Sequence, residues 1–342
     1  MLKNYFYSLL IILMSTPIQA MERIPAKKKQ HLTYFSIQTG VGTVKDFKYN
    51  HDGSRIIVLG SNNNVAEVWD TETHQLVRKF VDTSPITAVN FHPISDSVIT
   101  AHPYNIVKFW DFSSGAHLSS MKLDKCYNAT NESLISYMCF HDLDSISCTL
   151  SNPKKVKFQA NTNNQDASFA FEYKLKSNEQ LDLLTSYNNH YIFLRLKNSI
   201  TKNRSCKIFR INDNHVDELV DCLIYDYCYS TNNFLTSPNN KDLYEYPFAP
   251  DKEPQTSTLV PVYSGDSTIK SAIYNANGTE ILISTENGMI FIVQRKKSTS
   301  KQWKLVSWLP LNLDIVSDPI DSCKFAAASF KDNTITLFNC RH

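Results

Sequence analysis

The stretch Val65–Asp70 (VAEVWD) decides the fold, because the chain repeats it. Ile106–Asp111 (IVKFWD) has the same form, and its Trp-Asp pair comes 41 residues after the first. Each copy is an apolar run that ends in Trp-Asp, and a turn and a second short apolar run follow it. Repetition at a period of about 40–45 residues indicates an array of similar units that bury their apolar faces against one another.

The same rhythm continues to the C-terminus without the Trp-Asp signature. Apolar runs alternate with turns, and the third run of each unit contains one anchor position: Trp69, Trp110, Gln159, Phe209, Tyr246, Val293 and Phe338. Their mean spacing of about 45 residues predicts seven units of four strands. The last unit has only three runs, and the unassigned alternating segment His31–Ile37 supplies the fourth. We therefore expect an all-β chain whose N-terminal strand closes the last unit and so removes exposed sheet edges.

With these motifs the chain resembles the WD-repeat β-propeller family. The resemblance implies one seven-bladed propeller over residues 31–342, with four antiparallel strands per blade, A to D, running outward from a central channel. It also implies a protein or peptide partner held on the face formed by the D–A and B–C loops. In the family, an Asp in the B–C turn supports the Trp through hydrogen bonds. Only Asp332 matches it here, so we expect this network to be largely missing.

Several blades contribute candidates to the expected partner-binding face: Asn63, His102, Tyr104, Lys154, Lys241 and Asn287. Tyr104 is the best single anchor, because a turn tyrosine presents a large area at a small entropic cost. Nothing in the sequence identifies the partner. The alternative is a propeller-type hydrolase or lyase with its site at the central channel. Such a site needs converging carboxylates, and the aligned turn positions hold too few, so we expect a non-catalytic scaffold.

Composition and motifs argue against several other classes of function. With 35 basic and 33 acidic residues, the net charge of +2 provides no electrostatic footprint for nucleic acid. His-Glu-x-x-His, Cys-x-x-Cys, a phosphate loop and Gly-x-Ser-x-Gly are all absent from the sequence. We therefore expect no catalytic residue, no metal and no cofactor, and we expect a monomer.

The N-terminus has the features of an export signal. Lys3 supplies a positive charge, Tyr5–Met14 is an uninterrupted apolar run, and Ala20 is a small residue at the cleavage position. The apolar run is too short for a permanent membrane-spanning helix, which needs about 20 residues. We expect a signal peptide over residues 1–20, a polar linker over 21–30, and a periplasmic or extracellular mature protein without an integral membrane span. The alternative is that the apolar run is a buried first strand.

Eight cysteines in an exported chain favour disulfides. Three pairs flank expected hairpin turns: Cys139 with Cys148, Cys206 with Cys222, and Cys323 with Cys340. In an antiparallel hairpin, two positions equally far from the turn lie opposite one another, close enough for a bridge if their side chains share a face. The alternative is that they are buried free thiols that act as small apolar residues.

Overall fold

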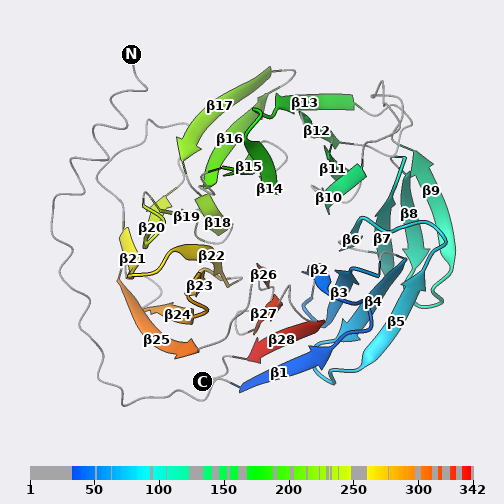
Figure 1. Cartoon of the computed structure of the whole chain (residues 1–342), viewed down its shortest axis with the longest axis horizontal. Coiled ribbons are helices and arrows are strands. Elements are labelled where there is room, and N and C mark those ends of the chain that lie inside the picture. The colour runs from blue at the N-terminus through cyan, green and yellow to red at the C-terminus, as the bar shows by residue number, and fades with distance from the viewer. Residues whose placement is uncertain are drawn as a thin grey trace.

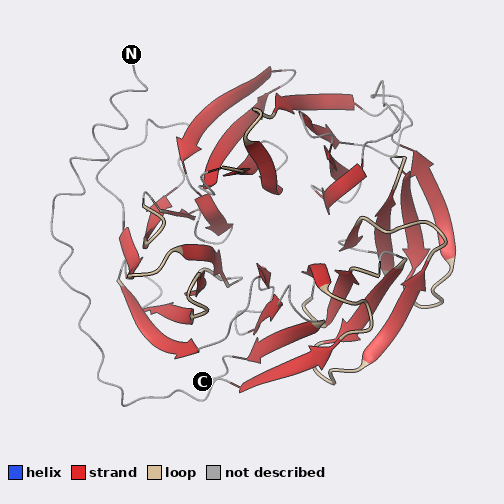
Figure 2. Ribbon diagram, viewed as in Figure 1, coloured by secondary structure: helices blue, strands red, loops and turns tan. Residues whose placement is uncertain are grey.

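The structure is a computed structural model made of antiparallel strands. It describes residues 33–50, 52–62, 64–92, 95–104, 106–122, 134–140, 146–151, 155–160, 168–187, 191–200, 204–212, 215–222, 224–228, 231, 233–237, 239–247, 260–275, 277–296, 302–309, 315–317, 324–328 and 333–339. Small sheets are arranged around a common centre (Figure 1). Within these ranges every regular element is a strand (Figure 2). The described part contains no helix long and apolar enough to span a bilayer.

The first two sheets contain the two Trp-Asp motifs. The first sheet runs in the order β2 (Val44–Tyr49), β3 (Arg55–Gly60), β4 (Val65–Asp70) and β5 (Leu76–Val81). The second runs in the order β6 (Ala88–Phe91), β7 (Ser97–His102), β8 (Ile106–Asp111) and β9 (His117–Lys122). The apolar run of β3 is buried at five consecutive positions, as expected for a strand packed between two neighbouring sheets.

The later sheets follow the same order from the centre outward. They are β14 (Glu179–Tyr187), β15 (Tyr191–Asn198), β16 (Arg204–Asn212) and β17 (His215–Cys222); β18 (Ile224–Cys228), β19 (Asn233–Thr236), β20 (Asp242–Pro247) and β21 (Val260–Ser264); β22 (Ile269–Tyr274), β23 (Glu280–Thr285), β24 (Ile290–Arg295) and β25 (Trp303–Leu309); and β26 (Ile315–Ser317), β27 (Lys324–Ala328) and β28 (Thr334–Asn339) with β1 (Thr33–Gln38).

Two two-stranded ladders precede β14, namely β10 (Leu134–Phe140) with β11 (Ile146–Ser151) and β12 (Lys155–Ala160) with β13 (Ser168–Lys174). We number the sheets as blades 1 to 7 in chain order, starting with the sheet of β2 to β5 and treating both ladders as blade 3. The architecture is a β-propeller, and the sheets are consistent with seven blades. Every expected anchor, from Trp69 to Phe338, lies in the third strand of its unit.

The N-terminal strand closes the last sheet, as the sequence predicts. β1 pairs antiparallel with β28 over its whole length, and the two strands lie side by side in Figure 1. The observed strand is shifted by one or two residues from the expected segment His31–Ile37. Phe35 of β1 also stacks on His74, with ring centroids 3.8 Å apart. The closing strand is therefore held by blade 7 and by the C–D turn of blade 1.

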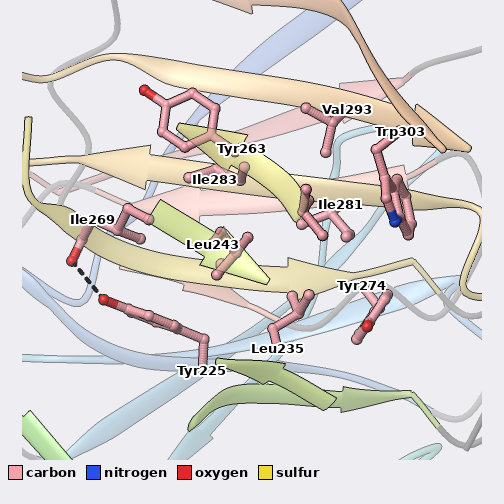
Figure 3. Close-up of a cluster of buried hydrophobic side chains, with 12 residues drawn as sticks. Tyr225, Leu235, Leu243, Tyr263, Ile269, Tyr274, Ile281, Ile283, Val293 and Trp303 are labelled. Atoms are coloured by element: carbon pink, nitrogen blue, oxygen red, sulfur yellow. Dashed lines mark hydrogen bonds between the residues drawn. The ribbon is translucent and has the colours of Figure 1, made fainter. Parts of the chain in front are cut away.

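The hydrophobic core lies between neighbouring blades. In the described part, separate buried clusters join blades 7 and 1, blades 1 and 2, blades 5 and 6, and blades 6 and 7. Figure 3 shows the cluster between blades 5 and 6, where Leu243 of β20 packs near Ile281 and Ile283 of β23. There the Tyr225 hydroxyl also donates to the Ile269 carbonyl at 3.2 Å. Each blade thus depends on its neighbours for burial, as expected of a repeat architecture.

Candidate functional site

The D–A loops and the B–C turns lie at the same end of the blades, because successive strands alternate in direction. We call this surface the loop face; it consists of the described residues within 39–43, 61–64, 82–87, 103–105, 175–178, 199–203, 237–241, 265–268 and 286–289. The two loop types are bonded to each other. In blade 1 the Asn62 amide donates to the Val41 carbonyl at 2.8 Å, and in blade 6 the Glu286 amide donates to the Thr268 carbonyl at 2.9 Å. The loop face is therefore a connected surface.

Tyr104 projects from the loop face in blade 2. It is 62% exposed, and its backbone has a φ of 62°. This left-handed conformation is uncommon for a bulky residue and costs roughly 1–2 kcal/mol. In blades 5 and 6 the comparable positive-φ positions are Asn240 and Gly288, residue types that adopt the conformation readily. Blade 2 therefore holds an aromatic ring at a position where the backbone disfavours it.

A chain of hydrogen bonds lies next to this turn. The Trp110 Nε1 donates to Thr100 Oγ1 at 2.8 Å, and Thr100 Oγ1 is 2.7 Å from His102 Nε2. Asp82 of the D–A loop lies 3.9 Å from the same imidazole nitrogen and accepts a 2.6 Å hydrogen bond from Lys108. Thr100 Oγ1 therefore accepts the indole proton and links the indole to the imidazole of His102.

This arrangement corrects the expectation that the supporting network is missing. In blade 2 the carboxylate comes from the D–A loop at Asp82 instead of from the B–C turn. His102 is 0% exposed, so it supports the loop face from within the blade and has no surface to offer a partner. Sequence reasoning missed this network because it looked for the acidic residue in the B–C turn alone.

Burial and Lys108 set the charges of this network. Burial opposes ionisation of Asp82, but the hydrogen bonds from Lys108 and the Ser84 backbone amide, together with the positive charge of Lys108, hold the pKa of Asp82 below its usual value. Burial lowers the pKa of His102; the Asp82 carboxylate opposes that shift and Lys108 adds to it. At pH 7, therefore, Asp82 is ionised and His102 is neutral.

Blade 1 supports its tryptophan in another way. Trp69 Nε1 donates to Glu67 Oε2 at 3.2 Å, and the Gly40 amide donates to the same oxygen at 2.9 Å. Glu67 is 1% exposed, and its other oxygen lies 2.8 Å from Lys79 Nζ. A Cβ at Gly40 would lie 2.6 Å from that second oxygen, so the glycine leaves room for the carboxylate. Blades 1 and 2 therefore each have a buried carboxylate where the loop face meets strand C.

A third buried carboxylate joins blades 5 and 6, near the strand ends opposite the loop face. Glu245 accepts hydrogen bonds from Asn233 Nδ2 at 2.9 Å, from the Tyr274 hydroxyl at 3.1 Å and from Trp303 Nε1 at 3.3 Å. It also pairs with Arg295, whose guanidinium lies 4.5 Å from the centre of the Trp303 ring. Figure 3 shows the rings of Tyr274 and Trp303 in this cluster. Glu245 is thus a junction between two blades.

The other candidate residues fall into two groups. Lys241 and Asn287 are exposed on the loop face, in blades 5 and 6. Their part in binding stays a prediction. Four candidates lie outside the described residues: Asn63, Lys154, Cys323 and Cys340.

The two remaining cysteine pairs differ in strand register. Cys206 lies directly opposite Cys222 across β16 and β17. Cys139 and Cys148 are one residue out of register across β10 and β11. Both bridges stay predictions, but only the first has the register that a hairpin disulfide needs.

The innermost strand of blade 1 bears on the enzyme alternative. Burial raises the pKa of Asp46, against the opposing effect of Lys48, whose Nζ is 3.6 Å away. Within the described ranges, no group of three or more His, Cys, Asp and Glu side chains is placed to hold a metal ion. Asp46, whose pKa burial raises, is therefore held in an ion pair with Lys48.

The fold is that of known propellers. No protein-family model and no curated protein matches the sequence. Among solved structures, the chain is similar to the β-propeller domain of Cps50 (Swd1) from Myceliophteria thermophila, with 14% identity and a TM-score of 0.62 over 89% of this chain and 99% of that one. It is also similar to a chain of the mitotic checkpoint complex, with 10% identity and a TM-score of 0.64 over 94% and 97%. With the two Trp-Asp strands, these likenesses show a WD-repeat β-propeller fold.

Proposed function

We propose that this chain is an exported, non-catalytic scaffold that holds a protein or peptide partner on its loop face. The observation that carries this proposal is Tyr104, an exposed aromatic ring kept in a disfavoured backbone conformation. Strained residues of this kind cluster at functional sites, where the surrounding structure enforces them. One similar solved structure is a chain of a mitotic checkpoint complex, a multi-component assembly, which supports a scaffold role.

The loop face is suited to binding because it is organised before a partner arrives. Hydrogen bonds join its D–A loops to its B–C turns, and the Asp82 and Glu67 networks brace it from within. A preorganised surface loses little conformational entropy on binding. Tyr104 then serves as the central anchor, and Lys241 and Asn287 supply polar contacts from other blades.

Two substitutions at one position test this role. Tyr104→Ala removes the ring and keeps the unfavourable φ, whereas Tyr104→Gly removes the ring and relieves the backbone strain. Both should weaken partner binding by about 2 kcal/mol, roughly 30-fold. The alanine variant should stay within about 0.5 kcal/mol of wild-type stability, and the glycine variant should be up to about 1 kcal/mol more stable than the alanine variant. The matched control is Leu118→Ala, since Leu118 is 56% exposed on strand β9 of the same blade, away from the loop face.

Affinity and melting temperature are measured on the same preparations, with a partner captured by the mature protein from its own cell envelope or medium. Wild-type affinity in both Tyr104 variants would remove blade 2 from the binding surface. A loss of several kcal/mol of stability in Tyr104→Ala would instead mean that the ring packs within the blade.

Export is the part of the proposal that rests on residues 1–20. We expect the mature protein to begin at Met21 and to be found outside the cytoplasm. Mass spectrometry of the N-terminal peptide, on protein from its native cell, decides the matter. An intact Met1–Lys3 terminus on the mature protein contradicts export through a cleaved signal.

A further inference from the structure

Blade 4 contains two cysteines that the strand register brings together. β16 and β17 pair antiparallel, with Cys206 directly opposite Cys222. Directly opposed positions lie on the same face of a sheet, with Cα atoms about 4.5–5.5 Å apart. A disulfide needs Cα atoms about 4.4–6.8 Å apart. The register therefore meets the backbone requirement for a bridge without displacing either strand.

A β-bulge produces this alignment. Nearer the turn, Phe209 pairs with Glu218, and between Ile208 and Phe209 the register shifts by one residue. Without that shift Cys206 would lie opposite Asp221 and not opposite Cys222. A bulge inserts one extra residue into one strand, which is the displacement needed here.

The other hairpin with two described cysteines lacks the alignment. Across β10 and β11, Cys139 lies opposite Ser147, and Cys148 lies opposite Met138. Successive positions along a strand lie on opposite faces of the sheet, so these two cysteines occupy different faces. A bridge between them would require the strands to slip by one residue, which makes this pair an internal control.

We propose that Cys206 and Cys222 form a reversible disulfide by exchange with a small-molecule disulfide such as oxidised glutathione. The Cys206 thiolate attacks one glutathione sulfur, which gives a mixed disulfide and releases one glutathione thiolate. The deprotonated Cys222 then attacks the Cys206 sulfur, which forms the protein disulfide and releases the second glutathione. The protein loses two electrons, glutathione disulfide gains them, and the two cysteine protons pass to the released thiolates.

The bridge lies at the loop-face end of blade 4. β16 follows the B–C turn directly, and β17 ends just before the chain enters blade 5. The bridge closes a short loop between strands C and D, which restricts the opened state of the chain. Oxidation therefore opposes peeling of the outermost strand, β17, from the blade. This inference does not depend on whether the loop face binds a partner.

The test is a thiol map of the full-length protein in glutathione buffers with an increasing oxidised fraction. Thiols that remain are blocked with N-ethylmaleimide, the protein is digested without reductant, and the peptides are identified by mass spectrometry. We expect a linked peptide containing Cys206 and Cys222 that disappears with dithiothreitol. Cys206→Ser should abolish it and Cys139→Ser should leave it intact.

A second readout keeps the result interpretable if a variant folds poorly. Oxidation should raise the melting temperature of the wild-type protein by several degrees and leave that of Cys206→Ser unchanged. Alkylation of both Cys206 and Cys222 in the folded wild-type protein at every buffer ratio overturns the proposal. A bridge from Cys206 to any other cysteine overturns it as well.

Discussion

Replacing Glu245 with alanine should destabilise the propeller more than any single surface change. Glu245 is 2% exposed and accepts hydrogen bonds from Asn233, Tyr274 and Trp303 while it pairs with Arg295. The substitution removes the acceptor of three neutral donors and the counter-charge of a guanidinium whose side chain is itself only 9% exposed. Both losses fall at the junction between blades 5 and 6, where Figure 3 shows the surrounding apolar side chains.

The magnitude follows from which group is left without a partner. Breaking a buried ion pair from one side costs about 3–5 kcal/mol, chiefly because an uncompensated charge stays buried. Three donors lose their acceptor as well, so Glu245→Ala should lie at the upper end, near about 5 kcal/mol. Arg295→Met should cost less, because the three neutral donors still satisfy the carboxylate that remains. The double variant should lose at least about 2 kcal/mol less than the sum of the two single changes, since no charge is left behind.

Urea unfolding at pH 7, followed by tryptophan fluorescence and by circular dichroism, measures these differences from the midpoint and slope. Both probes must give one transition before the free energies are compared, because a multi-blade chain can unfold in parts. Glu245→Gln serves as the matched variant that keeps the volume and removes only the charge. A loss below about 1 kcal/mol for Glu245→Ala would refute the reasoning, as would a larger loss for Arg295→Met.

Two further predictions concern ring closure and acid stability. Deleting residues 31–39 removes β1 and exposes the edge of β28, so this variant should aggregate or lose cooperative melting. Deletion of residues 22–30 is the control and should leave melting unchanged. A monomeric variant without residues 31–39 that keeps the wild-type melting curve would contradict the closing role of β1. The backbone amide of Thr73 donates to Asp70, and the hydroxyl of Ser114 donates to Asp111. These hydrogen bonds are the main reason that the pKa of each aspartate is lower than usual. Such carboxylates stabilise the fold above their unfolded pKa of about 3.9, and the stability is lost as pH falls through the folded pKa. Melting temperatures between pH 7 and 2 should therefore drop at the acid end, less so in an Asp70→Ala/Asp111→Ala variant; an identical pH profile for that variant disproves the assignment.

The architecture could be predicted from sequence because its determinants are local. The third strand of each blade is a short run between turns. Spacing and alternation therefore predict the correct strand even for Gln159 and Val293, which lack the Trp-Asp signature. The closing strand is predictable for the same reason. The last unit has only three apolar runs, and the alternating segment His31–Ile37 belongs to no other unit.

The hydrogen bonds of the buried carboxylates and the alignment of the cysteines could not be predicted. They join segments far apart in the sequence, and the pairing of those segments cannot be deduced from the local pattern. The blade 2 network needs Asp82, Thr100 and Trp110 from three separate stretches, and its acidic member comes from an unexpected loop. No motif marks Glu67 or Glu245 in the sequence, yet both are buried and accept hydrogen bonds from distant segments. Strand register aligns Cys206 with Cys222 but leaves Cys139 and Cys148 one residue apart. Such shifts depend on bulges and turn lengths, so the spacing of two cysteines about a turn does not reveal them.

The pairing of β1 with β28 also fixes where anything attached to this protein can reach. Thr33 lies opposite Asn339, so chain entering the propeller and chain leaving it pass through the same spot on its outer edge. β1 runs from there toward the loop face, which it meets at residue 39, so that spot is at the opposite end of the blades. A tether at either terminus, whether a membrane anchor, a solid support or a fused domain, would therefore hold the disc from behind. The protein could be crowded onto a surface by either end with Tyr104 still directed outward.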